Sequence, residues 1–148
     1  MTLELARRAD DSNDGQKRCR SRRILLAEDN REMRSLLAVA LQAEGYEVTQ
    51  CHDGDQFVDR IVTASPGVDF DLIISDVRMP GHSGLELLDA GQQIEGFPPM
   101  ILITAFGSDV LHDRARRLGA VAVFDKPFDV DDLVGKVVET LQSGSHKR

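Results

Sequence analysis

Short apolar runs alternate with longer stretches of helical periodicity along this sequence, and that alternation restricts the fold more than any other feature. Four runs of four to six mainly apolar residues lie at 24–27, 71–75, 100–105 and 120–124, and a fifth predicted strand lies at 46–51. Runs of this kind are typical of strands that are buried on both faces of a sheet. Because a helical pattern follows each run, we predict a doubly wound α/β fold with five parallel strands and helices on both faces.

The five intervening segments have the periodicity of amphipathic helices. In the first, apolar residues recur at i, i+3, i+4, i+7 and i+8, namely at Met33, Leu36, Leu37, Ala40 and Leu41. Capping boxes open the second helix at Asp53 and the third at Ser83. The fourth helix is predicted over 108–118 and the fifth over 130–141. Gly91 falls inside the predicted third helix, where glycine costs about 1 kcal/mol relative to alanine.

Charge and composition restrict the location and the partners. Residues 1–23 carry seven basic and four acidic side chains, so the rest of the 148-residue chain holds a formal charge of about −10. We predict a disordered basic leader at 1–22, a flexible tail at 143–148, and an acidic body that does not bind nucleic acid directly. Two cysteines without metal spacing, and no apolar run as long as a membrane span, favour a cytoplasmic protein that does not insert into membranes.

Polar side chains gather at the predicted carboxyl ends of the strands, which is where open α/β sheets bind ligands. Glu28 and Asp29 follow the first strand, Asp76 follows the third, Thr104 lies near the end of the fourth, and Lys126 follows the fifth. Any one of them alone has an ordinary structural explanation as a cap, a strand residue or a surface cation. Together they place three carboxylates at one edge, where each pair about 5 Å apart repels by roughly 3 kcal/mol at an effective dielectric near 20.

A hard cation relieves such repulsion. Magnesium prefers oxygen ligands and is commonly held by one or two carboxylates together with phosphate oxygens. The ammonium of Lys126 and the hydroxyl of Thr104 suit phosphoryl oxygens. The predicted crevice is therefore complementary to Mg²⁺ and a phosphoryl group.

Several of these motifs in this order resemble the receiver domain of two-component response regulators. They are Glu28-Asp29, DVRMPG from Asp76, ITAFG around Thr104 and DKPF around Lys126, and the likeness covers 23–142. The resemblance implies a chemotaxis-regulator-like (βα)5 fold with the flavodoxin-like strand order 2-1-3-4-5.

The resemblance also implies a role for each residue. Asp76 is then the phosphoacceptor, and Lys126 and Thr104 assist it. Mg²⁺ is then held by Asp29, Asp76 and the backbone carbonyl of Arg78, with Glu28 acting through water. Thr104 and Phe124 then form the switch.

As a partner, the resemblance implies a histidine kinase or a histidine phosphotransfer protein. The output surface comprises the helix at 108–118, the strand at 120–124 and the helix at 130–141, and it controls a downstream protein. Such a domain is a phosphorelay switch that promotes only its own phosphorylation and dephosphorylation, not an enzyme with turnover. Dimerisation is left open.

Three other functions share some of these sequence features. The chain could be the receiver fragment of a larger transcriptional regulator or hybrid kinase, although few residues follow the last predicted helix. A haloacid-dehalogenase-type phosphatase also uses Asp, Mg²⁺, Thr and Lys, but it needs D-x-D directly after the first strand, where this sequence has E-D-N at 28–30. A P-loop enzyme is excluded because no G-x-x-x-x-G-K occurs.

Overall fold

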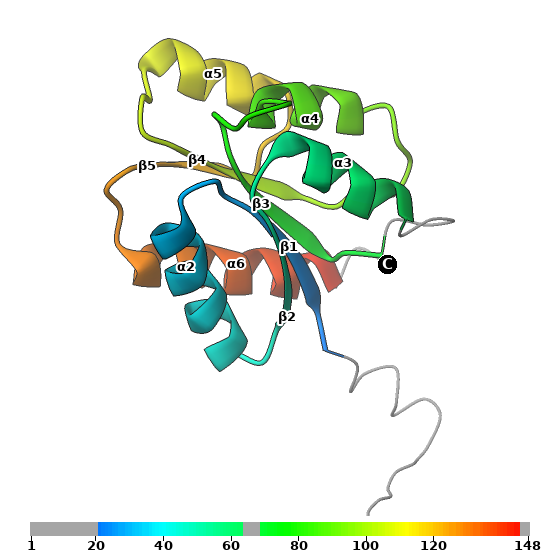
Figure 1. Ribbon diagram of the computed structural model, residues 1–148, viewed down its shortest axis with the longest axis vertical. Coiled ribbons are helices and arrows are strands. Elements are labelled where there is room, and N and C mark those ends of the chain that lie inside the picture. Colours follow the sequence, from blue (N-terminus) through cyan, green and yellow to red (C-terminus); the bar gives the residue numbers. More distant parts are fainter. Residues whose placement is uncertain (1–20, 64–68, 146–148) are drawn as a thin grey trace, which may run out of the picture.

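A five-stranded parallel sheet forms the centre of the molecule (Figure 1). The computed structural model describes residues 21–63 and 69–145. The strand order is β2-β1-β3-β4-β5, and every neighbouring pair is parallel, which confirms the predicted fold and strand order. The strands are β1 (Arg23–Ala27), β2 (Glu47–Cys51), β3 (Leu72–Asp76), β4 (Met100–Thr104) and β5 (Ala122–Asp125).

Five helices cover the two faces of this sheet. They are α2 (Arg31–Ala43), α3 (Gly54–Thr63), α4 (Gly84–Gly91), α5 (Asp109–Arg117) and α6 (Val130–Ser145). Helices α2 and α6 lie on one face, and α3, α4 and α5 lie on the other (Figure 1). Within the described part of the chain, no helix combines the length and apolarity needed to cross a bilayer.

Alternation along the strands divides the core into two layers. In β1, Ile24 and Leu26 pack with α2 and α6, whereas Leu25 and Ala27 pack with residues of α3, α4 and α5. Successive side chains of a strand point to opposite faces, so a strand covered on both sides must be apolar at nearly every position. The predicted apolar runs are the strands for this reason.

The third helix is shorter than its sequence pattern suggests. Gly91 is the last residue of α4, not an interior residue, and the helix ends there. A Cβ on Gly91 would lie 2.7 Å from Cζ of the Phe97 ring, so glycine lets the segment that follows α4 pack closely against it. Most of the predicted leader at 1–22, and residues 146–148 of the predicted tail, lie outside the described residues.

Close packing at the start of α3 leaves no room for a Cβ at Gly54. A Cβ on Gly54 would lie 2.6 Å from the backbone oxygen of His82, and the Gly54 amide also donates to the Pro80 carbonyl at 2.8 Å. Gly54→Ala should therefore destabilise the protein by about 1–3 kcal/mol, the usual cost of overpacking against backbone. Gly135→Ala is the control, because open space surrounds Gly135 within α6 and alanine should stabilise by about 0.5–1 kcal/mol. Urea unfolding measures both, and equal stability of Gly54→Ala and wild type would contradict the prediction.

Candidate functional site

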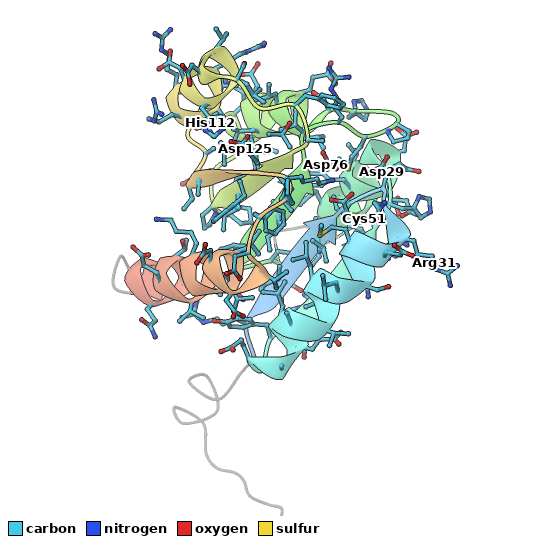
Figure 2. The ribbon with its side chains drawn as sticks, turned by 90° about the vertical axis from the view of Figure 1, so that its left-hand side faces the viewer. Asp29, Arg31, Cys51, Asp76, His112 and Asp125 are labelled. Atoms are coloured by element: carbon cyan, nitrogen blue, oxygen red, sulfur yellow. The ribbon has the colours of Figure 1, made fainter. Side chains whose placement is uncertain are left out.

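Four strands bring polar side chains to one edge of the sheet. Glu28 follows β1, Asp76 ends β3, Thr104 ends β4 and Lys126 follows β5. Because parallel strands share the direction of their carboxyl ends, these positions meet although they span almost a hundred residues of sequence. Glu28, Asp76 and Thr104 are each at most 4% exposed, while Asp29 is exposed. Figure 2 shows Asp29 and Asp76 at this edge.

Lys126 joins the two buried carboxylates. Its Nζ lies 2.8 Å from Oδ2 of Asp76 and 3.1 Å from Oε1 of Glu28. Backbone amides hold the other oxygens, since Asn30 N–H donates to Glu28 Oε2 and Arg78 N–H donates to Asp76 Oδ1, both at 3.0 Å. Both carboxylates and the ammonium are thus fixed in position.

The carboxylates have the arrangement of a cation site. One oxygen each of Glu28, Asp29 and Asp76 lie within 4.8 Å of one another. Glu28 Oε1 is buried and accepts no hydrogen bond, although the Lys126 ammonium lies beside it. A hard cation, or a water bound to one, would satisfy this oxygen, and the all-oxygen set fits Mg²⁺. The residues present therefore fit the metal that the sequence implied.

Burial controls the ionisation of this cluster. It raises the pKa of Glu28 to about 7, and the Asp76 charge adds to this effect against the Asn30 amide and Lys126. For Lys126, burial lowers the pKa, but the hydrogen bond and the negative charges of Asp76 and Glu28 outweigh it and the net pKa is raised. The ammonium therefore stays charged, while Glu28 exchanges a proton near neutral pH.

Magnesium binding should therefore depend on pH. At pH values below the Glu28 pKa of about 7, this side chain holds a proton that the cation must displace. The affinity for Mg²⁺ should therefore fall by up to about tenfold from pH 8 to pH 6. Isothermal titration calorimetry with MgCl₂ measures this directly. Glu28→Gln carries no titrating group at this position and should bind more weakly, with a flatter pH profile. An affinity of the wild type that is equal at both pH values would contradict the prediction.

A pocket of about 450 Å³ opens onto this site. Its lining consists of Asp29, Asn30, Asp76, Arg78, Ala105, Phe106 and Lys126. The Arg78 guanidinium lies 4.8 Å from the centroid of the Phe106 ring, so these two side chains form one wall of the pocket. The volume and the polar lining suit a small charged group at Asp76.

Two supporting contacts had no signal in the sequence. Nη1 of Arg34, on the first turns of α2, donates to the backbone oxygen of Glu28 at 2.8 Å. The Glu28 amide in turn donates to the Cys51 carbonyl at 3.1 Å, which ties the end of β1 to the end of β2. An arginine in an amphipathic helix is ordinarily a solvated residue, and only the packing of α2 on the sheet gives Arg34 this role.

Phe124 and Thr104, the two predicted switch residues, lie on opposite faces of the sheet. The Phe124 ring packs in the layer of α2 and α6, where its centroid lies 5.9 Å from that of Phe128. Thr104 has the same parity in β4 as Leu102, which belongs to the opposite layer. The β5 residue that packs in that layer is Val123. The reason is the period of two in a strand, which reverses the face when the assignment moves by one residue.

Comparison with known proteins gives one family. The model of the response regulator receiver domain matches residues 24–138. The chain is 39% identical over 116 residues to the transcriptional regulatory protein PdtaR of Mycobacterium tuberculosis, covering 76% of this chain and 53% of PdtaR. It is 32% identical over 111 residues to the sporulation initiation phosphotransferase F of Bacillus subtilis, covering 75% of this chain and 86% of that protein.

A solved structure gives the same result for the fold. The CheY-like receiver domain protein from Methanospirillum hungatei superposes with a TM-score of 0.78 at 25% identity, covering 87% of this chain and all of that one. The chain therefore spans about half the length of PdtaR but matches that receiver domain protein from end to end.

Proposed function

Since the chain belongs to the response regulator receiver domain family, whose function is phosphorylation-dependent switching, we propose that Asp76 is its phosphoacceptor. The observation that carries the proposal is the contact of 2.8 Å between the Lys126 ammonium and a buried Asp76 carboxylate, next to two further carboxylates. This is the charge arrangement that a phosphoryl group needs on its acceptor. Asp29, Asp76 and the Arg78 backbone carbonyl would hold Mg²⁺, with Glu28 acting through water.

The chemistry is transfer of a phosphoryl group to a carboxylate. An oxygen of Asp76 forms a bond to phosphorus while the bond between phosphorus and the donor atom breaks, and that electron pair leaves with the donor. The donor is a phosphohistidine imidazole, which takes up a proton after it leaves. When bound, Mg²⁺ supplies positive charge that offsets the charge of the phosphoryl oxygens.

This chain's own residues do the positioning. Arg78 N–H donates to one Asp76 oxygen, and the Lys126 ammonium donates to the other. From this position the ammonium can also bind an oxygen of the transferred phosphoryl group and stabilise its negative charge. The Thr104 hydroxyl accepts from Phe106 N–H at 3.1 Å and has its own proton free to donate to a phosphoryl oxygen. Phosphoryl transfer requires mainly this kind of positioning and charge stabilisation.

The partners follow from the family. We propose that a histidine kinase or a histidine phosphotransfer protein donates the phosphoryl group, and that the surface formed by α5, β5 and α6 contacts a downstream protein. PdtaR is named a transcriptional regulatory protein, so control of transcription is the second candidate for the output. A cytoplasmic location stays a prediction.

Acetyl phosphate is the simplest donor for a test. With MgCl₂, intact mass spectrometry should find one added phosphoryl group on the wild-type protein, and none when EDTA replaces the metal. Hydrolysis of p-nitrophenyl phosphate with turnover would instead favour a phosphatase. A protein that gains no phosphoryl group at saturating acetyl phosphate and Mg²⁺ would contradict the proposal.

A further inference from the structure

A second side-chain contact joins two elements next to this site. Nε2 of His112, on the first turn of α5, lies 2.9 Å and 3.0 Å from the two carboxylate oxygens of Asp125, the last residue of β5 (Figure 2). The His112 side chain is 30% exposed and that of Asp125 is 55% exposed. The contact therefore fastens the start of α5 to the end of β5.

The segment between β4 and α5 packs directly against this pair. A Cβ on Gly107 would lie 2.8 Å from Cγ of Asp125 and 3.2 Å from Nε2 of His112. Glycine at 107 is thus required for the backbone to approach the carboxylate this closely. A displacement of Gly107 toward β5 would therefore bring this segment against the Asp125 carboxylate and the His112 ring.

Both sides of the contact lead to the proposed phosphorylation site. Asp125 precedes Lys126, whose Nζ contacts Asp76 and whose backbone N–H donates to the Thr104 carbonyl at 2.7 Å. Gly107 follows Phe106, whose N–H donates to the Thr104 hydroxyl. The site and the contact between α5 and β5 are therefore linked through two short stretches of backbone.

We propose that the His112–Asp125 pair is a latch that opposes switching and sets how readily Asp76 accepts a phosphoryl group. The proposal rests on the proposed function. With a free Asp76 carboxylate, Thr104 accepts from Phe106 N–H and the latch is closed. Movement of the Thr104 hydroxyl to a phosphoryl oxygen requires the segment that contains Phe106 and Gly107 to shift, and this shift opens the latch.

The expected change in phosphorylation rate follows from the partial exposure of the His112 and Asp125 side chains. A partly exposed ion pair or hydrogen bond contributes modestly, and a conformational equilibrium changes only by the difference in free energy between its two states. Removing the latch should therefore speed phosphorylation by about two- to fivefold. An effect of this size is measurable when rates are compared under identical conditions.

The test compares phosphorylation rates with acetyl phosphate at saturating Mg²⁺, followed by intact mass. Asp125→Ala and His112→Ala should each be about two- to fivefold faster than wild type, and the double variant no faster than either, because both remove the same contact. Asp113→Ala is the matched control, since Asp113 pairs with Arg116 and Arg117 within α5. Its rate should equal that of the wild type.

Asp125→Asn is the control for misfolding, because the asparagine amide oxygen can still accept a hydrogen bond from the His112 imidazole N–H. It should have an intermediate rate, and urea unfolding should show that it is folded. Wild-type rates in the three latch variants, or a double variant whose effect is the product of the singles, would overturn the latch. If the wild type is never labelled, the proposed function fails, and the latch proposal fails with it. A labelled wild type with unaltered latch variants overturns the latch alone.

Discussion

Asp76→Asn is expected to abolish the uptake of a phosphoryl group from acetyl phosphate, with no mass increase under conditions that label the wild type fully. The amide retains the shape of the carboxylate, and its oxygen can still accept from Arg78 N–H. It is not a nucleophile toward phosphorus, and it removes one ligand from the carboxylate cluster. Intact mass spectrometry of the variant measures the loss.

The control for this variant is an aspartate at the same edge of the sheet that lies outside the cluster. Asp53 Oδ1 accepts from Gln56 N–H at 2.7 Å at the start of α3, and asparagine can make the same hydrogen bond. Asp53→Asn should therefore be labelled like the wild type. Full labelling of Asp76→Asn would assign the acceptor to another residue.

Lys126→Met should slow phosphorylation by about a hundredfold while strengthening Mg²⁺ binding. Removal of one preorganised charge at a reacting oxygen commonly costs about 10²–10³ in rate. The same change removes a cation that lies 2.8 Å from Asp76 and 3.1 Å from Glu28, so both buried carboxylates lose their counter-charge and attract a divalent ion more strongly. Labelling kinetics and calorimetry measure the two effects separately.

The opposite changes in phosphorylation rate and Mg²⁺ affinity distinguish the predicted role of Lys126 from general damage to the fold. A misfolded protein would lose both phosphorylation and metal binding. Lys136→Met is the control, since Lys136 on α6 pairs only loosely with Glu139, at 3.8 Å, and should leave both quantities unchanged. A wild-type labelling rate in Lys126→Met would remove Lys126 from the mechanism.

The sheet and the cluster of polar side chains at the carboxyl ends of its strands could be predicted from the sequence for a physical reason. Strands buried on both faces need continuous apolar runs, and Leu72, Ile73 and Ile74 in β3 are each completely buried. Parallel strands end at a common edge, so a polar residue directly after each run had to lie at that edge. The gathering of Glu28, Asp76 and Lys126 followed from this rule alone.

Other features depend on contacts that no local pattern encodes. The face on which Phe124 lies depends on the register of β5 with β4, in which Phe124 pairs with Ile103 and not with Thr104. The sequence predicted Gly91 as a destabilising residue inside a helix. In the structure it is the last residue of α4, where the Phe97 ring packs too closely for a Cβ. His112 and Asp125 are 13 residues apart on different elements, and only the packing of α5 beside β5 brings them together.

The location of the phosphoryl group is the most direct test of the whole account. After labelling with acetyl phosphate and Mg²⁺, borohydride reduction converts an aspartyl phosphate to homoserine, and tandem mass spectrometry of the peptides reads its position. We expect homoserine at residue 76 alone, and only in samples that contained Mg²⁺. Homoserine at another carboxylate, or a phosphoryl group that resists borohydride on a different type of side chain, would contradict the account.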